Sequence, residues 1–230
     1  MQKHLCIALL FLFFAGGALF AGDVATFVNL GFSENSDILM FGQYGVRGED
    51  GRAYAEIYTV DVEKNRFVKG GVEQEMFDAE IEAAQDGRGG LYKLLHRVEP
   101  LVKKYKINHL ATGRLVYLFI DGNEVKERLT FRDFHHGDSY DLTLVQENFG
   151  EGEDVSASFH IKLTVTDKEG KKESYTLGLP DYKREGVHLY RINRVFFSPD
   201  EQGLVCVLEK HLRGEEGKSI RYMVETVRLN

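Results

Sequence analysis

Two segments far apart in the chain have similar sequences, and this self-similarity constrains the possible folds more than any other feature. The phrase that begins at Phe32 aligns with the phrase that begins at Phe197, and residues 48–52 align with residues 214–218. Internal similarity of this kind usually reports a repeated supersecondary unit. We therefore predict a single β-rich domain, residues 22–230, with one copy of the unit at each end. The predicted copies cover about residues 25–68 and 190–230.

Each copy has the pattern of three antiparallel strands. Side chains alternate in character from Tyr54 to Thr59, and alternation with a period of two is typical of a half-buried strand. The segment Ser198-Pro199-Asp200-Glu201 has residues that favour a β-turn. The predicted strands of the two meanders cover residues 25–32, 38–44, 54–62, 190–197, 204–210 and 220–229.

Between the two copies the pattern changes. Over about residues 73–106 the apolar residues fall at helical spacing, with Phe77 and Ile81 in a first stretch and a longer Leu and Val stripe in a second. Pro100 is expected to kink the second helix or to begin a new turn. From about residue 112 to 180 strand patterns return, separated by turn residues. The predicted central strands cover residues 115–121, 127–134, 140–148, 155–166 and 173–179.

These patterns predict a mainly β fold with a helical insertion. Antiparallel meanders of this kind form a sandwich, a barrel or a partial propeller-like arrangement. A parallel α/β sheet is disfavoured, because most strands follow one another with only turns between them.

The N-terminus has the composition of a secretory signal peptide over residues 1–21. Lys3 precedes an apolar run from Leu5 to Phe14, and small residues follow that run. We expect cleavage after Ala21, with cleavage after Ala18 as the alternative. The protein is therefore predicted to be secreted or periplasmic. The mature chain is predicted to have no transmembrane anchor, since a spanning helix needs ~18 or more apolar residues.

The charge balance and the cysteine content disfavour several classes of function. The formal net charge is −7, and the signal peptide carries a single charged residue, Lys3. Binding to a phosphate backbone needs clustered Lys and Arg, so nucleic acid is not an expected partner. Cys206 is the one cysteine of the predicted mature chain. The sequence therefore has no disulfide framework and no cysteine-ligated zinc site.

Parts of the sequence resemble two known families. Phe197-Ser198-Pro199-Asp200 resembles a phrase in the blades of TolB-type β-propellers, which implies a blade-like meander. Over the mature chain, the sequence also resembles a family of predicted secreted bacterial proteins of unknown function. That resemblance implies secretion and a shared fold, and it brings no catalytic residues. It is carried by residues 21–25, 30–33, 41–46, 54–58 and 180–190.

Few residues have a pattern that points to chemistry. The motifs of α/β-hydrolases, zinc proteases and nucleotide-binding loops do not occur in the sequence. The sharpest candidate is a divalent-metal site at His135, His136 and Asp138, since imidazole and carboxylate groups ligate such ions. Adjacent histidines of a strand point to opposite faces, so a polar hairpin turn is the alternative interpretation. No other cofactor is expected.

Two further candidates use carboxylates alone. The acidic loop from Glu147 to Asp154 offers oxygen ligands for calcium, with a solvated hairpin tip as the alternative. Glu56 and Asp61 would form the carboxylate pair of a glycoside hydrolase if both flank one cleft.

Two groups of residues are candidates for binding. A basic cluster on the predicted helix would attract an anionic partner or lipid head groups, with a solvated helix face as the alternative. Tyrosines on the predicted strands would form a platform for a sugar, with cross-strand packing as the alternative. The basic residues are Lys93, Arg97, Lys103, Lys104 and Lys106, and the tyrosines are Tyr44, Tyr54, Tyr58, Tyr182 and Tyr190.

The leading hypothesis is a secreted or periplasmic module that binds without catalysis and contacts an envelope protein or another component of the cell envelope. A first alternative is an envelope hydrolase or metal-dependent enzyme that uses His135, His136 and Asp138. A second alternative is a carrier that holds a small ligand in an apolar cavity between the sheet and the helices.

Overall fold

The structure is a computed structural model, and it describes residues 23–82, 85–213 and 219–229. The strands within these residues form three antiparallel sheets. The first sheet has the order β4-β3-β2-β1-β5, with β1 (Thr26–Ser33), β2 (Ile38–Val46), β3 (Arg52–Asp61), β4 (Arg66–Glu80) and β5 (Ile107–Asn108). The second has the order β13-β12-β11-β6, with β6 (Arg114–Leu118), β11 (Val187–Phe197), β12 (Gly203–Leu212) and β13 (Ser219–Arg228). The third has the order β10-β9-β8-β7, with β7 (Arg128–Arg132), β8 (Ser139–Phe149), β9 (Ser156–Thr166) and β10 (Lys172–Glu185).

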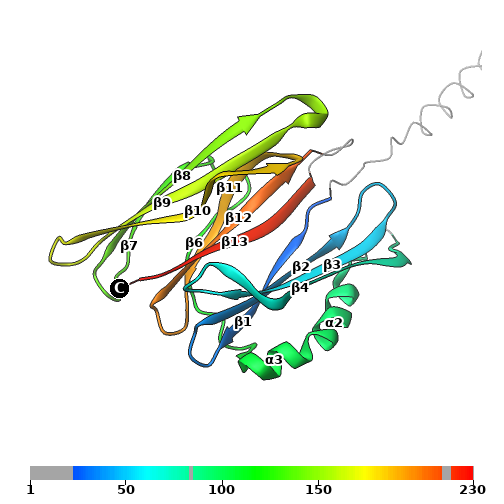
Figure 1. Cartoon of the computed structure of the whole chain (residues 1–230), viewed down its shortest axis with the longest axis horizontal. Helices are drawn as coiled ribbons and strands as arrows, with labels where there is room; N and C mark the ends of the chain where they lie inside the picture. The colour runs from blue at the N-terminus through cyan, green and yellow to red at the C-terminus, as the bar shows by residue number, and fades with distance from the viewer. Residues whose placement is uncertain (1–22, 83–84, 214–218, 230) are drawn as a thin grey trace, which may run out of the picture.

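The sheets are stacked as layers, with the second sheet in the middle (Figure 1). Successive side chains of a strand point to opposite faces, so a strand between two sheets must be apolar at every position. The run from Leu204 to Leu208 on β12 meets this requirement, and all five of its residues are 0% exposed. Its even-numbered residues pack with the third sheet, against residues such as Phe159 and Ile161. Val205 and Val207 pack with the first sheet, against residues such as Phe27 and Phe41.

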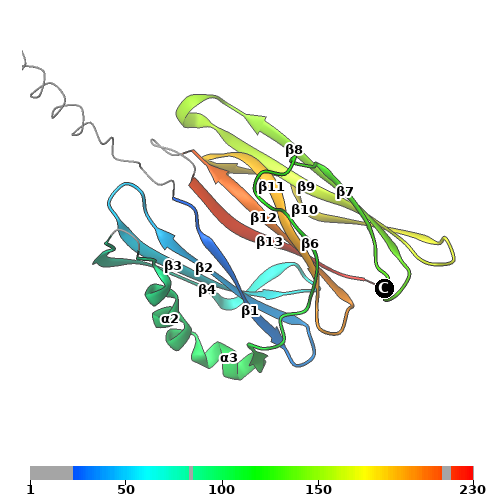
Figure 2. The same cartoon turned by 180° about the vertical axis from the view of Figure 1, so that it is seen from behind.

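Two helices cover the outer face of the first sheet, as the view from behind also shows (Figure 2). They are α2 (Arg88–Arg97) and α3 (Glu99–Tyr105). Leu91 and Leu94 of α2 are buried against Met40 and Ile57 of the sheet. The layers therefore run from helices through the first and second sheets to the third. Neither of these helices has the length and apolar character that crossing a membrane requires.

The two self-similar segments form meanders in different sheets. The first segment builds β1, β2 and β3, and the second builds β11, β12 and β13. Both contribute to one apolar cluster, in which Phe32 meets Phe196 edge to face with ring centroids 6.1 Å apart. The mainly β fold with a helical insertion is confirmed. Of the predicted arrangements, the structure supports the sandwich, and none of the described sheets closes into a barrel.

The predicted helical segment at residues 73–106 is wrong at its start. Residues 73–80 belong to β4, which pairs with β3 through Ile57 with Glu73 and Tyr54 with Met76. Phe77 and Ile81 are four residues apart, a spacing that puts two side chains on one side of a strand as well as of a helix. Hydrogen-bonded pairing with β3 makes this segment a strand and not a helix. Pro100 lies in the first turn of α3, where its missing N–H costs nothing, so the expected break is confirmed.

Candidate functional site

A cavity of about 570 Å³ opens where the outer strands of the three sheets come together. We call it the edge cavity. Its walls come from β3, β4 and the turn between them, from the end of β10 and from β13, with one residue each from β2 and β12. A volume of this size is typical of pockets that hold small organic molecules. The lining residues are Phe41, Tyr58, Val60, Lys64, Asn65, Arg66, Phe67, Leu179, Tyr182, Arg184, Lys210, Tyr222, Met223, Val224 and Glu225.

The turn between β3 and β4 is tied to β13 by Asn65. Asn65 has a φ of 49°, a left-handed conformation that Asn tolerates better than most residues. Its side-chain oxygen accepts a hydrogen bond of 2.8 Å from the backbone N–H of Thr226, and its amide donates to Glu225. The Thr226 hydroxyl donates to the carbonyl of Val62 at 2.7 Å. These bonds hold one wall of the edge cavity against the second sheet.

The outer edge of β13 is closed by side chains in place of a neighbouring strand. The backbone N–H of Tyr222 donates to Gln43 Oε1 at 2.7 Å, and Gln43 Nε2 donates to the Tyr222 carbonyl at 3.2 Å. Alternate residues of an antiparallel strand direct their peptide groups to the same edge. Val224 lies between Tyr222 and Thr226 and therefore faces this edge too, and no described residue forms a hydrogen bond with its peptide group there. Val224 is also one of the residues that line the edge cavity.

Aromatic and aliphatic side chains from different sheets line the cavity. Phe41, Tyr58 and Phe67 form a stacked row, with centroid distances of 5.0 and 5.3 Å between successive rings. Three large apolar side chains around the cavity are exposed: Phe67 by 53%, Leu179 by 60% and Tyr182 by 56%. Apolar side chains that gather on a surface in this way are characteristic of binding sites.

The charges around the cavity are predominantly positive. Lys64 pairs with Asp61 at 2.5 Å, and Arg184 lies 4.0 Å from Glu225. Arg66 and Lys210 form no salt bridge with a described residue. Burial lowers the pKa of Lys210 and raises the pKa of Glu225, because both charged forms lose contact with water.

The predicted metal residues lie in the turn between β7 and β8. His136 Nε2 is 2.5 Å from Glu201 Oε2, and His135 Nδ1 is 3.8 Å from Glu201 Oε1. Asp133, rather than Asp138, completes a group in which the ligand atoms of Asp133, His136 and Glu201 lie within 4.8 Å of one another. Asp138 instead accepts a backbone hydrogen bond of 2.8 Å from Asp133. Sequence spacing suggested neither Asp133 nor Glu201.

The positive charge of Arg114 already balances the negative charge of the carboxylates in this group. Its guanidinium donates two hydrogen bonds to Asp133, at 3.0 and 2.9 Å, and two to Glu201, at 2.7 and 3.1 Å. Hydrogen bonding to Arg114 holds the pKa of Glu201 below its usual value. The group therefore joins the β7–β8 turn of the third sheet to β6 and the β11–β12 turn of the second. An arginine in this position also opposes the binding of a second cation.

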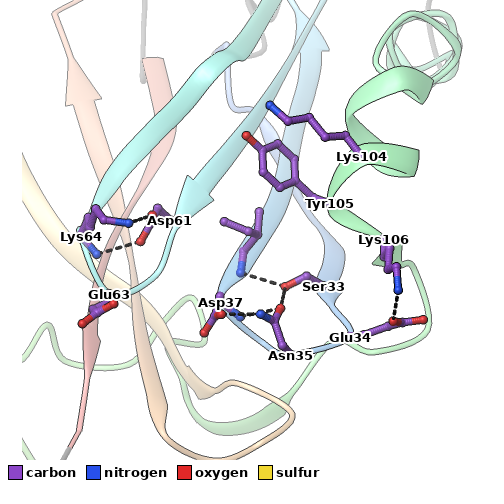
Figure 3. Close-up of a pocket in the computed structure, with 11 residues that line it drawn as sticks. Ser33, Glu34, Asn35, Asp37, Asp61, Glu63, Lys64, Lys104, Tyr105 and Lys106 are labelled. Atoms are coloured by element: carbon purple, nitrogen blue, oxygen red, sulfur yellow. Dashed lines mark hydrogen bonds and ion pairs between the residues drawn. The ribbon is translucent and has the colours of Figure 1, made fainter.

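A second cavity, of about 490 Å³, lies between the β1–β2 turn, the β3–β4 turn and the end of α3 (Figure 3). Several of its polar groups pair with one another. Lys106 bonds Glu34 at 3.2 Å, and Ser33 Oγ donates to Asn35 Oδ1 at 2.7 Å, while Asn35 also bonds Asp37. These contacts hold the turns in shape. They leave the edge cavity as the stronger candidate for a ligand site.

The predicted basic residues of the helices lie near acidic or aromatic partners. Arg97 bonds Glu73 at 2.8 Å and Glu75 at 2.5 Å, and Lys103 bonds Glu99 at 2.7 Å. The Lys93 ammonium lies 5.2 Å from the ring centre of Phe77, and that of Lys104 lies 4.7 Å from the ring centre of Tyr105. An anionic partner at this face remains a prediction.

The predicted tyrosines divide into two groups. Tyr44 and Tyr54 are buried, where Tyr44 accepts a bond from Arg88 at 3.2 Å and Tyr54 donates to Asp23 at 2.9 Å. Tyr190 is buried between the second and third sheets. Tyr58 and Tyr182 line the edge cavity together with Phe67, which the sequence pattern did not single out.

The predicted carboxylate pair separates in the structure. Glu56 accepts hydrogen bonds of 2.6 Å from both Gln43 and Tyr58, whereas Asp61, at the end of β3, accepts one from Lys64 of the β3–β4 turn. They line different cavities, so the structure does not bring them together across one cleft.

One comparison with known proteins gives a family. A family model described as predicted secreted protein (DUF2259) matches residues 40–228. No curated protein matches the chain. The family description confirms the expectation of secretion, while the predicted signal peptide and its cleavage sites lie outside the described residues. Because the match covers most of the chain, the protein belongs to this family of predicted secreted proteins.

Proposed function

We propose that this secreted protein is a binding module, without catalysis, that holds a small organic molecule in the edge cavity. The observation that carries the proposal is the gathering of exposed Phe67, Leu179 and Tyr182 from two sheets around one cavity of about 570 Å³. Exposing such side chains to water is unfavourable unless a partner covers them.

The position of the cavity differs from that expected for a carrier. Between the first sheet and the helices, the space is filled by Met40, Ile57, Leu91 and Leu94. At the edges of the sheets, by contrast, Asn65 and Gln43 hold the walls in place by hydrogen bonds. A site with walls fixed in advance loses less entropy when a ligand binds.

The rival enzyme hypothesis has less support from the same structure. Its sharpest candidate group contains Asp133, His136 and Glu201, and Arg114 already bonds both carboxylates. These contacts favour a structural role in joining two sheets.

Native mass spectrometry of the protein purified from a secreting host tests the proposal. We expect an additional mass of a few hundred daltons that denaturation releases. The double variant Phe67→Ala/Tyr182→Ala should lose this mass, whereas Tyr92→Ala, which removes a ring of 60% exposure from α2, should keep it. Absence of a bound mass, together with no thermal shift from any apolar probe, would contradict the proposal.

A second candidate function is contact with an envelope protein at the outer edge of the second sheet. Apolar side chains are exposed on β6 and after it, and they include Leu115, Leu118, Ile120 and Val125. A photo-crosslinking residue at Leu118 should give a discrete adduct in the secreted compartment. A crosslinker at exposed Lys172 serves as the control, and equal labelling from both positions would count against this surface.

A further inference from the structure

We infer that the ligand of the edge cavity is an organic carboxylate with an apolar body. Its acidic group would lie with Arg184 and Lys210, and its body would lie against Phe67, Leu179 and Tyr182. This inference rests on the proposed function and names the chemical class of the ligand.

The first support is the local charge. The whole chain has a formal net charge of −7, yet four of the five charged residues that line the cavity are cations. Among them, Lys64 has Asp61 as its partner, and Arg66 and Lys210 have no salt bridge to a described residue. A concave site with an excess of one sign concentrates ligands of the opposite sign.

The second support is the geometry of Arg184. Its guanidinium lies 4.9 Å from the ring centre of Tyr182 and 5.0 Å from that of Phe159. The carboxylate of Glu225, at 4.0 Å from the Arg184 guanidinium, lies beyond hydrogen-bonding distance. A guanidinium has five N–H donors and matches a carboxylate in a planar, two-bond arrangement. Arg184 is thus held by aromatic rings, and no carboxylate among the described residues lies within hydrogen-bonding distance of its guanidinium.

The third support is the environment of Lys210. The charged groups that act on it are Glu56, Arg184 and Arg221, and burial has the largest effect and lowers its pKa. A partly desolvated ammonium next to other cations gains more from an added anion than an exposed lysine does. Glu225, whose pKa is raised by burial, is the one acidic residue in the lining.

The edge of β13 argues for a small molecule over a peptide strand. Strand addition needs several successive free peptide groups on one edge. Ile220 bonds the backbone of Asp23 and Ala25, Tyr222 bonds Gln43, and Thr226 bonds Asn65. Among these outward-facing residues, Val224 alone has a peptide group without a partner among the described residues, and one free peptide group is too few for strand addition.

Three probes with one chain length and different head groups test the inference by titration calorimetry of the full mature protein. They are dodecanoate and dodecyltrimethylammonium, each below its micellar concentration, and dodecanol below its solubility limit. We expect dodecanoate to bind with one-to-one stoichiometry at least tenfold more tightly than either other probe. Naphthalene-2-carboxylate, tested in parallel, shows whether an aromatic or an aliphatic body fits better.

Variants locate the acidic group. Lys210→Met, which keeps an apolar stem, should weaken dodecanoate binding about tenfold and leave dodecanol binding unchanged. Lys172→Met, on exposed β10 outside the cavity lining, is the matched control and should bind as the wild type does. Arg184→Met, which removes the other cation at the proposed position of the acidic group, is the second variant in case Lys210→Met fails to fold.

The outcomes separate this inference from the proposed function. If dodecanol or dodecyltrimethylammonium binds as tightly as dodecanoate, the carboxylate class is wrong and the binding function stands. Unchanged dodecanoate affinity in whichever of Lys210→Met and Arg184→Met folds would overturn the position of the acidic group. If no probe binds and the purified protein carries no small molecule, the binding function itself is contradicted.

Discussion

At the scale of single residues, two glutamine side chains act as substitutes for a neighbouring strand. Gln43 of the first sheet pairs with the N–H and the carbonyl of Tyr222. Gln146 of the third sheet does the same with Tyr190, at 2.8 and 3.2 Å. Both tyrosines belong to the second sheet. A primary amide has a donor and an acceptor in nearly the geometry of a peptide group, so each glutamine attaches an outer sheet to the middle one.

Replacement of Gln43 by leucine should lower the free energy of unfolding by about 2–4 kcal/mol, because a buried group left without its hydrogen bond costs ~1–3 kcal/mol. Gln43 is 0% exposed, so water cannot replace the lost bonds. Urea denaturation measures the change. The exposed Gln85→Leu is the control, and equal stability of the two variants would contradict the role given to Gln43.

Replacement of Glu225 by glutamine should change the pH dependence of stability. Burial raises the pKa of Glu225 in the folded state above its unfolded value, which is about 4.3 for a glutamate. The contribution of Glu225 to the free energy of unfolding is therefore fully present below about pH 4, and it is lost as the pH rises through the pKa of the folded state. Relative to the wild type, Glu225→Gln should gain stability between pH 4 and pH 8. Parallel curves of unfolding free energy against pH for the two proteins would refute this.

At the scale of elements, β12 shows how a strand becomes the centre of a layered fold. Its side chains alternate between two apolar clusters, one shared with the first sheet and one with the third. Cys206 points toward the third sheet and is 0% exposed. Such a strand needs an unbroken apolar run, whereas a strand of an outer sheet such as β8 alternates between buried and more exposed positions over its first half.

The thiol of Cys206 should be unreactive in the folded protein. Burial raises the pKa of this thiol, so the thiolate that reacts with disulfide reagents is scarce at pH 8. We expect labelling by a chromogenic disulfide reagent to be slow in buffer and complete in guanidinium chloride. Rapid labelling under native conditions would show that β12 opens far more readily than its packing indicates.

At the scale of the whole molecule, the sheets are joined by polar contacts at their ends as well as by their apolar faces. Arg114, Asp133 and Glu201 join the third sheet to the second, and Asn65 joins the first sheet to the second. Each contact links residues far apart in the chain, so it forms only when the layers have assembled. The edge cavity depends on the same assembly, because its walls come from all three sheets.

Replacement of Arg114 by methionine should lower the free energy of unfolding by about 2–4 kcal/mol, since loss of one partner leaves a buried charge uncompensated. The carboxylate at risk is that of Asp133, whose side chain is 2% exposed. Adding Asp133→Asn should restore part of the loss. Arg128→Met, which removes an exposed pair with Asp141, should cost less than about 1 kcal/mol. Similar losses for Arg114→Met and Arg128→Met, measured by urea denaturation, would exclude this role.

Local patterns in the sequence predicted most of the strands. They also predicted secretion, which the family description confirms. Alternation and turn residues act over a few positions, so one segment is enough to recognise them. The same patterns failed at residues 73–80, because the spacing of Phe77 and Ile81 fits both a helix and a strand. They singled out Phe197-Ser198-Pro199-Asp200 and its counterpart at Phe32 without showing that these meanders face one another.

The candidate sites were decided by tertiary structure. His135 and His136 are neighbours in sequence, yet the residue that joins them is Glu201, 65 positions from His136. Asn65 and Glu225 meet across 160 positions at the edge cavity. By itself the sequence determined secretion and the β-rich class, because these depend on composition and short periods. Which sheets face each other, and therefore where a cavity forms, depends on packing between distant strands that no local pattern encodes.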